Sequence, residues 1–323
     1  MIVVITNYDW DKIGIFFNSY VKANFENTDL VVYADNIKEV TLNKIKQCAT
    51  FVLPIPDEYK KRQILNIRWK LSSIYLKENI DKYNLVFTAD VRDLFFQKDV
   101  FKYYQNIKKS FLGLALEDGF IGQESVNTGW IKAAYKNDIY DSIASERIIC
   151  MGTVWGTVDK FVEFVDIMWE KLNTEWANKT GVIDQAVGNV IIHHDKLFSD
   201  SIIHSNNIDG PVMSIALTNR VFINLDKNKN VLNVKGDIAA VVHQYDRKAD
   251  IVQIAKDKYY PEFNVIKKEE DKKQKKENTL KISVLIASIL CFLILSTLYY
   301  YQHKNKNNEI ISVVKNNEEE EGK

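Results

Sequence analysis

Short apolar runs alternate with stretches of helical spacing in the first part of the chain, and this alternation restricts the fold to the α/β class. Residues 2–6, 30–33 and 50–53 have the composition of buried strands. Between them and after them, residues 13–25 and 60–78 place apolar side chains at helical intervals. Strands that alternate with helices imply a parallel sheet with right-handed crossovers. We therefore predict a mostly parallel sheet with flanking helices.

The next apolar run ends in an acidic cluster. Residues 85–88 resemble a buried strand, and Asp90, Arg92 and Asp93 follow closely. Ligands of open α/β sheets bind at the carboxyl ends of the strands, where two carboxylates could hold a divalent cation against a diphosphate. Alternatively, Asp90 caps a helix that begins near Val91, while Arg92 and Asp93 form a surface ion pair. Taken alone, the cluster favours this second interpretation.

Two later apolar runs also end in polar groups. Residues 111–116 are followed by Glu117 and Asp118, and residues 239–247 bring His243 to the end of a strand-like run. A histidine at a strand end, beside charged groups, is a better ligand candidate than a lone histidine in a core. The repetition favours a polar site along one edge of the sheet.

The middle of the chain contains two further segments of interest. Residues 125–131 are predicted to be a loop that leads into a helix. Residues 147–156 form an apolar strand running into a turn that contains Gly152 and Gly156. Such glycines let a backbone approach a ligand closely, although tight packing would explain them equally well.

Composition excludes several classes of function. The chain has 323 residues, of which 46% are hydrophobic, and 43 basic residues balance 43 acidic ones. This is a globular composition, and the absence of a basic excess argues against nucleic acid as a partner. Neither the GxGxxG fingerprint nor a P-loop is present, so nicotinamide and ATP sites lose their usual support. Cys48, Cys150 and Cys291 are too few and too scattered for a disulfide framework, and we expect reduced thiols.

The C-terminal part predicts a membrane anchor. Residues 282–301 carry no charge and end in tyrosines, which suits a span of about 20 apolar residues with an interfacial belt. Residues 264–281 form a charged stalk, and residues 302–323 are predicted to be a disordered tail. With a Lys-rich stalk and no signal peptide, we expect a catalytic domain over residues 1–263 on the cytosolic side. A luminal orientation stays open, because Asn178 lies in an Asn-Lys-Thr sequon.

Several motifs, taken in order, resemble glycosyltransferases of the GT-A type, which belong to the nucleotide-diphospho-sugar transferase superfamily. Each motif is weak by itself, but the ordered set is fairly specific and covers residues 1–263. One group within that superfamily carries an acidic DVRD segment and a terminal HQYDR. The matching pieces are Ala89-Asp90-Val91-Arg92-Asp93 with Phe96-Gln97, Asn127 with Trp130, Ile149-Cys150-Met151-Gly152-Thr153, Asp184-Gln185, and His243-Gln244-Tyr245-Asp246-Arg247.

The resemblance implies roles for individual residues. The metal ligands for Mn²⁺ or Mg²⁺ would be Asp90, Asp93 and His243. The donor would contact Thr6, Asn7 and Tyr8 with its base and ribose, and Arg68, Arg92 and Arg247 with its phosphates. The catalytic side would include Asp184, Gln185 and Asn127, although Asp184 opens a predicted helix and could serve merely as its N-cap.

Two residues depart from the pattern of the group. The acidic motif is Asp-Val-Arg-Asp instead of Asp-x-Asp, which leaves open whether Asp90 or Asp93 binds the metal. Met151 stands where the group more often has a small polar residue, and we expect this to alter the acceptor pocket.

The sequence thus predicts a membrane-anchored, metal-dependent glycosyltransferase that uses a UDP- or GDP-sugar and an unidentified glycan, protein or lipid acceptor. The alternative is a catalytically inactive relative that keeps the fold as a binding or scaffolding module. A phosphatase or nuclease would need a further nucleophile or lysine near the strand end, and none is evident. Retention or inversion at the sugar is not determined by the sequence.

Overall fold

The chain forms two compact units, Met1–Pro261 and Glu262–Lys323. The computed structural model describes residues 1–174 and 183–262, together with residues 278–279, 281–283, 285, 288 and 296–297. Only isolated positions of the second unit are described, so the architecture is defined for the first.

Most of the predicted stalk, membrane span and tail, at residues 264–281, 282–301 and 302–323, lies outside the described residues. The same holds for Asn178 and Cys291. Within the described part of the chain, no helix combines the length and the apolar composition needed to cross a bilayer. The membrane anchor stays a prediction from the sequence.

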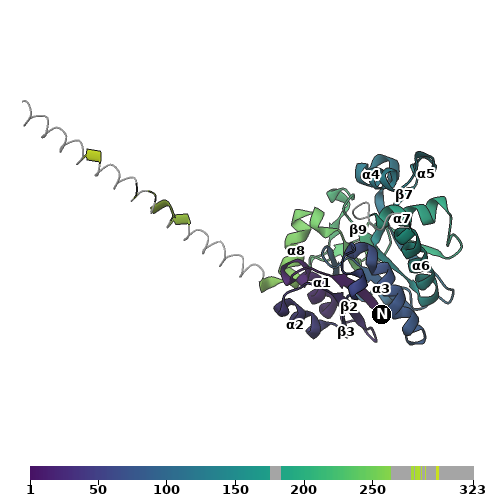
Figure 1. The fold of residues 1–323 in the computed structure, drawn as a ribbon, viewed down its shortest axis with the longest axis horizontal. Helices are drawn as coiled ribbons and strands as arrows, with labels where there is room; N and C mark the ends of the chain where they lie inside the picture. Colours follow the sequence, from purple (N-terminus) through teal and green to yellow (C-terminus); the bar gives the residue numbers. More distant parts are fainter. Residues whose placement is uncertain are drawn as a thin grey trace, which may run out of the picture. The chain divides into compact units, whose positions relative to one another are not determined.

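A seven-stranded sheet runs through the first unit in the order β3-β2-β1-β4-β7-β6-β8 (Figure 1). Neighbouring strands are parallel from β3 to β4 and between β6 and β8, whereas β7 is antiparallel to both β4 and β6. The predicted α/β class with a mostly parallel sheet is confirmed. The strands are β1 (Ile2–Thr6), β2 (Leu30–Ala34), β3 (Phe51–Pro54), β4 (Leu85–Ala89), β6 (Leu112–Phe120), β7 (Arg147–Thr157) and β8 (Ile202–Ser205).

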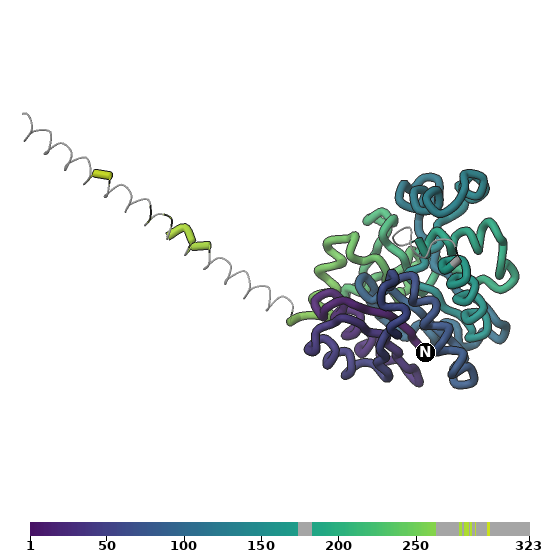
Figure 2. The backbone as a smooth tube through the Cα atoms, in the orientation of Figure 1, coloured from purple at the N-terminus to yellow at the C-terminus, as the bar shows by residue number. Residues whose placement is uncertain are grey.

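Helices bury the apolar strands. Every residue of β1 is buried, which requires cover on both faces of the sheet. Val3 and Ile5 share one core cluster with Trp69 and Phe164, whose rings meet edge to face where α3 packs on α6. The helices are α1 (Trp10–Ala23), α2 (Glu39–Cys48), α3 (Ile64–Glu78), α4 (Ser125–Ala134), α5 (Asn137–Ile143), α6 (Val158–Thr174), α7 (Asp184–Asn189) and α8 (Ala249–Tyr259). Figure 2 shows the α4–α5 segment projecting from the body of this unit.

A second, three-stranded sheet carries His243. Its order is β5-β12-β9, from β5 (Leu94–Phe96), β12 (Val241–His243) and β9 (Val212–Ser214). β12 is antiparallel to β5 and parallel to β9, so His243 pairs with Leu94 on one side and with Ser214 on the other. Strands β10 (Asn224–Leu225) and β11 (Val231–Leu232) form a short antiparallel pair. This register places His243 next to the end of the acidic cluster, because Asp93 immediately precedes β5.

Three predictions about local structure are wrong. No helix begins near Val91, so Asp90 is not a helix cap; the chain bends and then enters β5. Residues 125–131 are helical instead of a loop, since the Glu124 carboxylate accepts hydrogen bonds from the first N–H groups of α4. Residues 147–156 do not run into a turn, because β7 continues to Thr157 and pairs on both edges.

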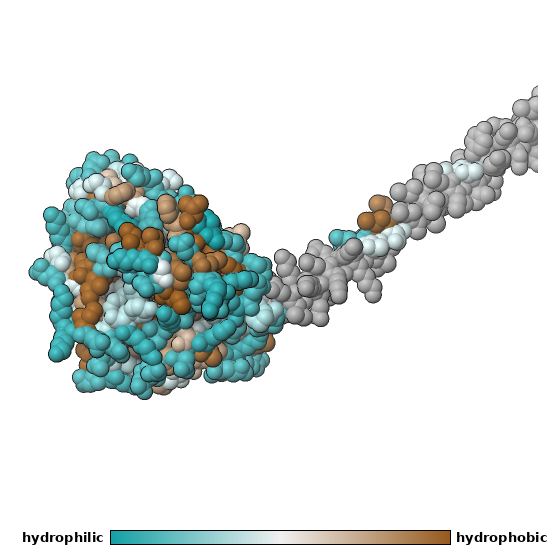
Figure 3. Space-filling model, turned by 180° about the vertical axis from the view of Figure 1, so that it is seen from behind, coloured by the Kyte–Doolittle hydropathy of each residue, from teal (hydrophilic) through white to brown (hydrophobic). Residues whose placement is uncertain are grey.

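The face of the first unit that Figure 3 shows is mainly hydrophilic, with separate apolar areas between the polar ones. The exposed large hydrophobic residues of the described chain include Phe120, Val126, Leu217, Val221 and Phe222. Leu217 lies near Gly119, where a Cβ atom would be 2.8 Å from its Cδ1.

Candidate active site

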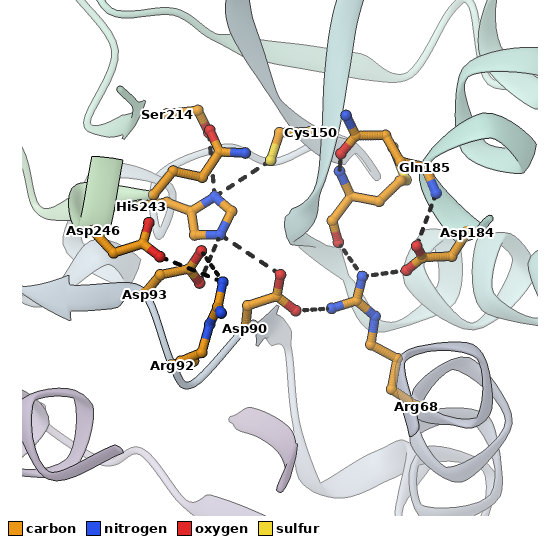
Figure 4. A network of polar contacts seen from close by, with 12 residues as sticks. Arg68, Asp90, Arg92, Asp93, Cys150, Asp184, Gln185, Ser214, His243 and Asp246 are labelled. Carbon is orange, nitrogen blue, oxygen red and sulfur yellow. Dashed lines mark hydrogen bonds and ion pairs between the residues drawn. The ribbon is translucent and has the colours of Figure 1, made fainter. Parts of the chain in front are cut away.

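Asp90, Asp93 and His243 converge beyond the carboxyl end of β4 (Figure 4). Nε2 of His243 lies 3.5 Å from Oδ1 of Asp93 and 3.7 Å from Oδ2 of Asp90. One potential ligand atom of each residue lies within 4.8 Å of the other two. The structure thus brings together the three residues that were predicted to hold a metal ion, although His243 is distant from the others in the sequence.

Gly152 in β7 permits this close approach. A Cβ atom there would lie 2.2 Å from Cε1 of His243, 2.6 Å from its Nε2 and 2.8 Å from Oδ2 of Asp90. The Gly152 carbonyl also accepts a hydrogen bond of 2.9 Å from the backbone N–H of Asp90. At Gly156, by contrast, a Cβ atom would meet the Phe111 carbonyl at 2.4 Å, which is a matter of strand packing. Of the two glycines noted in the sequence, Gly152 is therefore the one that belongs to the site.

The donor atoms suit a small divalent cation. Nε2 of His243 is buried and has no hydrogen-bond partner, although it faces two carboxylates. Carboxylate oxygens with one imidazole nitrogen form a ligand set for Mn²⁺, and carboxylates for Mg²⁺. The Asp90 side chain is 25% exposed, so solvent reaches the group from one side. These residues fit the metal that the resemblance implies.

A proton on His243 would compete with a cation. Burial disfavours the charged ring, but the neighbouring carboxylates of Asp93 and Asp90 favour it, and the pKa of His243 is raised well above 6.5. In the metal-free protein the two carboxylates therefore favour the charged form of the ring, which offsets their charge. Metal binding requires a neutral imidazole, so the proton must leave when a cation binds.

Arg68 links the metal group to Asp184. Its guanidinium is buried on α3, forms ion pairs with Asp90 and Asp184, and donates a hydrogen bond of 2.7 Å to the Met151 carbonyl (Figure 4). Burial raises the pKa of Asp90, but Arg68 and His243 reverse this effect and the pKa is lowered. Burial also raises the pKa of Asp184, which Arg68 offsets only in part. Arg68, predicted as a phosphate ligand, therefore lies among buried carboxylates.

Gln185 and Asn127 lie together beside this group. Nε2 of Gln185 donates to Oδ1 of Asn127 at 2.8 Å and to Oε1 of Glu117 at 3.4 Å, and Nε2 of Gln244 donates to the same Glu117 oxygen at 3.2 Å. Burial raises the pKa of Glu117, and the hydrogen bond from Gln244, the nearby His243 and the hydrogen bond from Gln185 offset this in part. Glu117 was not predicted as a site residue. The sequence did indicate it, because Glu117 directly follows the apolar run at residues 111–116. In the structure Glu117 lies within β6.

Met151 does not line this polar region with its side chain. It is fully buried, and a Cβ atom at Gly188 in α7 would lie 2.3 Å from its sulfur. Its backbone N–H donates to Oε1 of Gln185 at 3.3 Å. Met151, which departs from the pattern that the sequence otherwise resembles, therefore packs its side chain against α7. The contacts of this side chain do not support the expected effect on an acceptor pocket.

Two adjoining pockets lie beside the metal group and share Ile64. The larger, of about 450 Å³, contains Asn7, Asp35 and Asn36 after β1 and β2, together with Lys60, Lys61 and Arg62. The smaller, of about 250 Å³, contains Tyr8, Asp90, Arg92 and Asp93. Of the predicted donor residues, Asn7 and Tyr8 thus line pockets. Asp35, Asn36 and the two lysines were missed, although Asp35 and Asn36 come shortly after the strand predicted at residues 30–33.

Thr6 and the two predicted arginines differ in position. Thr6 is fully buried, and its hydroxyl accepts a hydrogen bond of 3.1 Å from the Tyr8 N–H, so it shapes the loop. Arg92 lies at the pocket wall and reaches Asp93 at 3.6 Å and Asp246 at 3.4 Å. Arg247 is more exposed and pairs with Asp246 at 3.4 Å. The Arg92–Asp93 ion pair, which the sequence offered as an alternative to a metal site, is thus formed beside the metal group.

Comparisons with known proteins give a distant likeness. No family model matches this chain, and no curated protein matches it. A structure of the galactosyltransferase LgtC with donor and acceptor sugar analogues is 12% identical with a TM-score of 0.44, and one of an active-site mutant of LgtC is 13% identical with a TM-score of 0.46. Both cover 75% of this chain and 86% of the LgtC chain. At these values the likeness carries no conclusion about function, which rests on the residues described above.

Proposed function

We propose that the first unit is a metal-dependent glycosyltransferase of the GT-A type, which transfers a sugar from a nucleotide diphosphate donor. The observation that supports this most is the group of Asp90, Asp93 and His243, with a buried Nε2 that lacks a hydrogen-bond partner, beside two adjoining pockets. A nucleotide diphosphate suits this arrangement, because a divalent cation joins its negative oxygens to protein carboxylates. The larger pocket has the size range of small-ligand sites.

Different residues around the metal group would bind different parts of the nucleotide-sugar. Asp90, Asp93 and His243 hold Mn²⁺ or Mg²⁺, which when bound supplies the positive charge that stabilises a leaving diphosphate. The base and ribose occupy the larger pocket, and its lysines add positive charge near the phosphates. Arg92 stands at the wall of the smaller pocket, within reach of a phosphate. We retain Arg247 as a second phosphate contact and assign the larger pocket to Asn7, Asp35, Asn36, Lys60 and Lys61.

The sugar and the acceptor would lie on the side of Gln185 and Asn127. These two amides form a hydrogen-bonded pair, and Glu117 accepts from Gln185. Asp184 is buried and paired with Arg68, so its part is to orient that guanidinium and the start of α7. Arg68, in turn, holds Asp90 in place from behind the metal group.

The test is donor hydrolysis by the full-length protein with UDP- and GDP-sugars, with and without Mn²⁺. We expect metal-dependent release of the nucleotide and its loss in Asp90→Asn and Asp93→Asn. Turnover that persists in EDTA would contradict the metal-dependent mechanism. Metal-dependent nucleotide binding without any turnover would favour the scaffolding alternative instead.

We also propose that residues 282–301 anchor the protein in a membrane, with the first unit on the cytosolic side. The support is the uncharged composition of this segment and the Lys-rich segment before it. We expect the protein to remain with membranes after extraction at alkaline pH, and a variant that ends at residue 281 to be released. Glycosylation of Asn178 in cells would show the opposite orientation.

A further inference from the structure

Cys150 and Ser214 hold the edge of the His243 ring that faces away from the carboxylates. Nδ1 of His243 lies 3.3 Å from Sγ of Cys150 and 3.5 Å from Oγ of Ser214 (Figure 4). Cys150 is 1% exposed and Ser214 is fully buried. Water therefore does not compete for this edge, and the two side chains decide what Nδ1 can bond to.

We propose that Cys150 and Ser214 are positioning residues that keep the proton of the neutral His243 ring on Nδ1 and so leave Nε2 free for a cation. The inference rests on the metal site of the proposed function. It adds Cys150 on β7 and Ser214 on β9, and neither of these two side chains forms a hydrogen bond with Asp90 or Asp93 in the described contacts.

The surroundings of the two ring nitrogens differ in the way this role requires. A neutral imidazole carries one proton, and the nitrogen without it offers a lone pair. A proton on Nδ1 finds a sulfur and a hydroxyl oxygen that can accept it. A proton on Nε2 would occupy the space between Asp90 and Asp93, where Nε2 has no hydrogen-bond partner. Metal-binding histidines have their tautomer fixed by the hydrogen bond at the other nitrogen.

Strand register fixes the position of Ser214. β12 and β9 pair so that His243 and Ser214 are direct neighbours. The backbone N–H and carbonyl of Ser214 are both hydrogen-bonded to the buried Asn207 side chain, at 3.0 and 2.8 Å. The backbone that carries the hydroxyl is therefore held in place beside His243.

The test compares Mn²⁺ affinity of the full-length protein, measured by electron paramagnetic resonance, in Cys150→Ala, Ser214→Ala and the double variant. We expect the double variant to bind Mn²⁺ about 10- to 100-fold more weakly than the wild type, with each single variant in between. Cys150→Ser, whose hydroxyl also accepts a hydrogen bond, should stay close to the wild type. Cys48→Ala, at the end of α2, is the matched control for loss of a thiol and should change nothing.

A second measurement separates this inference from the proposed function. Nitrogen-15 NMR of labelled histidines in the metal-free protein, above the pKa of His243, reports which nitrogen of the neutral ring carries the proton. We expect Nδ1–H in the wild type and loss of this preference in the double variant.

If the wild type fails to bind Mn²⁺, the proposed function fails, whereas the NMR result still supports or overturns the role of Cys150 and Ser214. A folded double variant with wild-type Mn²⁺ affinity, or a wild-type ring protonated at Nε2, would overturn the inference. If the double variant does not fold, Ser214→Ala alone, which removes one oxygen atom, decides the outcome.

Discussion

Gly152 lies against the ring of His243, so that a Cβ atom on Gly152 would stand only 2.2 Å from Cε1 of the histidine. The same atom would lie 2.8 Å from Oδ2 of Asp90. Neither neighbour can retreat easily, because His243 is fully enclosed and Asp90 is tied to Arg68. The absence of a side chain at this position thus keeps open the space between two of the proposed ligands.

We expect Gly152→Ala to move the His243 ring and the Asp90 carboxylate apart and to lower kcat/KM for donor hydrolysis by about 100-fold. Mn²⁺ titration of the purified variant checks the cause, since affinity should fall with activity. Gly129→Ala is the matched control: no heavy atom lies within 4 Å of its added Cβ, and in α4 it should stabilise the fold by up to about 1 kcal/mol. Equal Mn²⁺ affinity in both variants would contradict this role of Gly152.

Removal of Arg68 should be strongly destabilising. Arg68→Met leaves Asp90 and Asp184 without their shared cation in a buried setting, which costs about 3–5 kcal/mol in the free energy of unfolding. Urea unfolding in EDTA measures this loss without the contribution of a metal. Arg220→Met, which breaks the exposed pair with Asp250, is the control and should cost at most about 1 kcal/mol. Similar losses in the two variants would show that the buried network contributes no more than a surface pair.

Without metal, the stability of the fold should fall as the pH rises through the pKa of His243, whereas with Mn²⁺ it should rise over the same range. The raised pKa of His243 means that its charged ring stabilises the metal-free fold fully below pH 6.5, and that this contribution is lost as the pH rises through the folded-state pKa. Mn²⁺ displaces the proton, so its affinity should rise by up to about tenfold per pH unit over that range. Thermal unfolding between about pH 6 and pH 8, with EDTA or Mn²⁺, measures both effects.

His243→Gln should remove both pH effects, whereas His194→Gln, at a more exposed histidine, should leave them in place. An Mn²⁺ affinity that does not depend on pH in the wild type would show that no proton leaves His243 on binding.

Glu117→Gln should lower turnover while leaving the metal site intact. The amides of Gln185 and Gln244 both donate to one oxygen of the Glu117 side chain, and the amide oxygen of a glutamine is a weaker hydrogen-bond acceptor than a carboxylate oxygen. Misplacement of Gln185 should reduce kcat by up to about 100-fold with little change in Mn²⁺ affinity. Asp118→Asn, at the next residue, serves as the control. A parallel fall in Mn²⁺ affinity and kcat would place Glu117 on the metal side instead.

Local patterns in the sequence were sufficient for most strands of the central sheet, although β8 was not predicted. The assignment of Asp90, Asp93 and His243 as metal ligands rested on the resemblance and stays a prediction. The runs before Asp90 and His243 are short and apolar, and both side chains follow the rule that ligands gather at strand ends. The sequence did not predict that Arg68 forms an ion pair with Asp90. Arg68 lies on a helix among other charged residues, and its burial depends on how α3 packs on α6.

Glu117 was missed because its burial cannot be predicted from its neighbours in the sequence. A carboxylate after a strand is usually solvated, and only the tertiary structure shows that Glu117 is buried between two glutamines. The helix at residues 125–134 was missed because its cap is Glu124, which is not among the usual N-cap residues.

The central claim is that Asp90, Asp93 and His243 together bind a divalent cation that recruits a nucleotide diphosphate. Isothermal titration of UDP and GDP into the full-length protein, with Mn²⁺ and with EDTA, tests it most directly. We predict binding of at least one nucleotide that depends on Mn²⁺ in the wild type and is lost in Asp90→Asn, Asp93→Asn and His243→Gln while all three variants stay folded. Nucleotide binding of equal strength in EDTA, or binding retained by all three folded variants, would contradict the account.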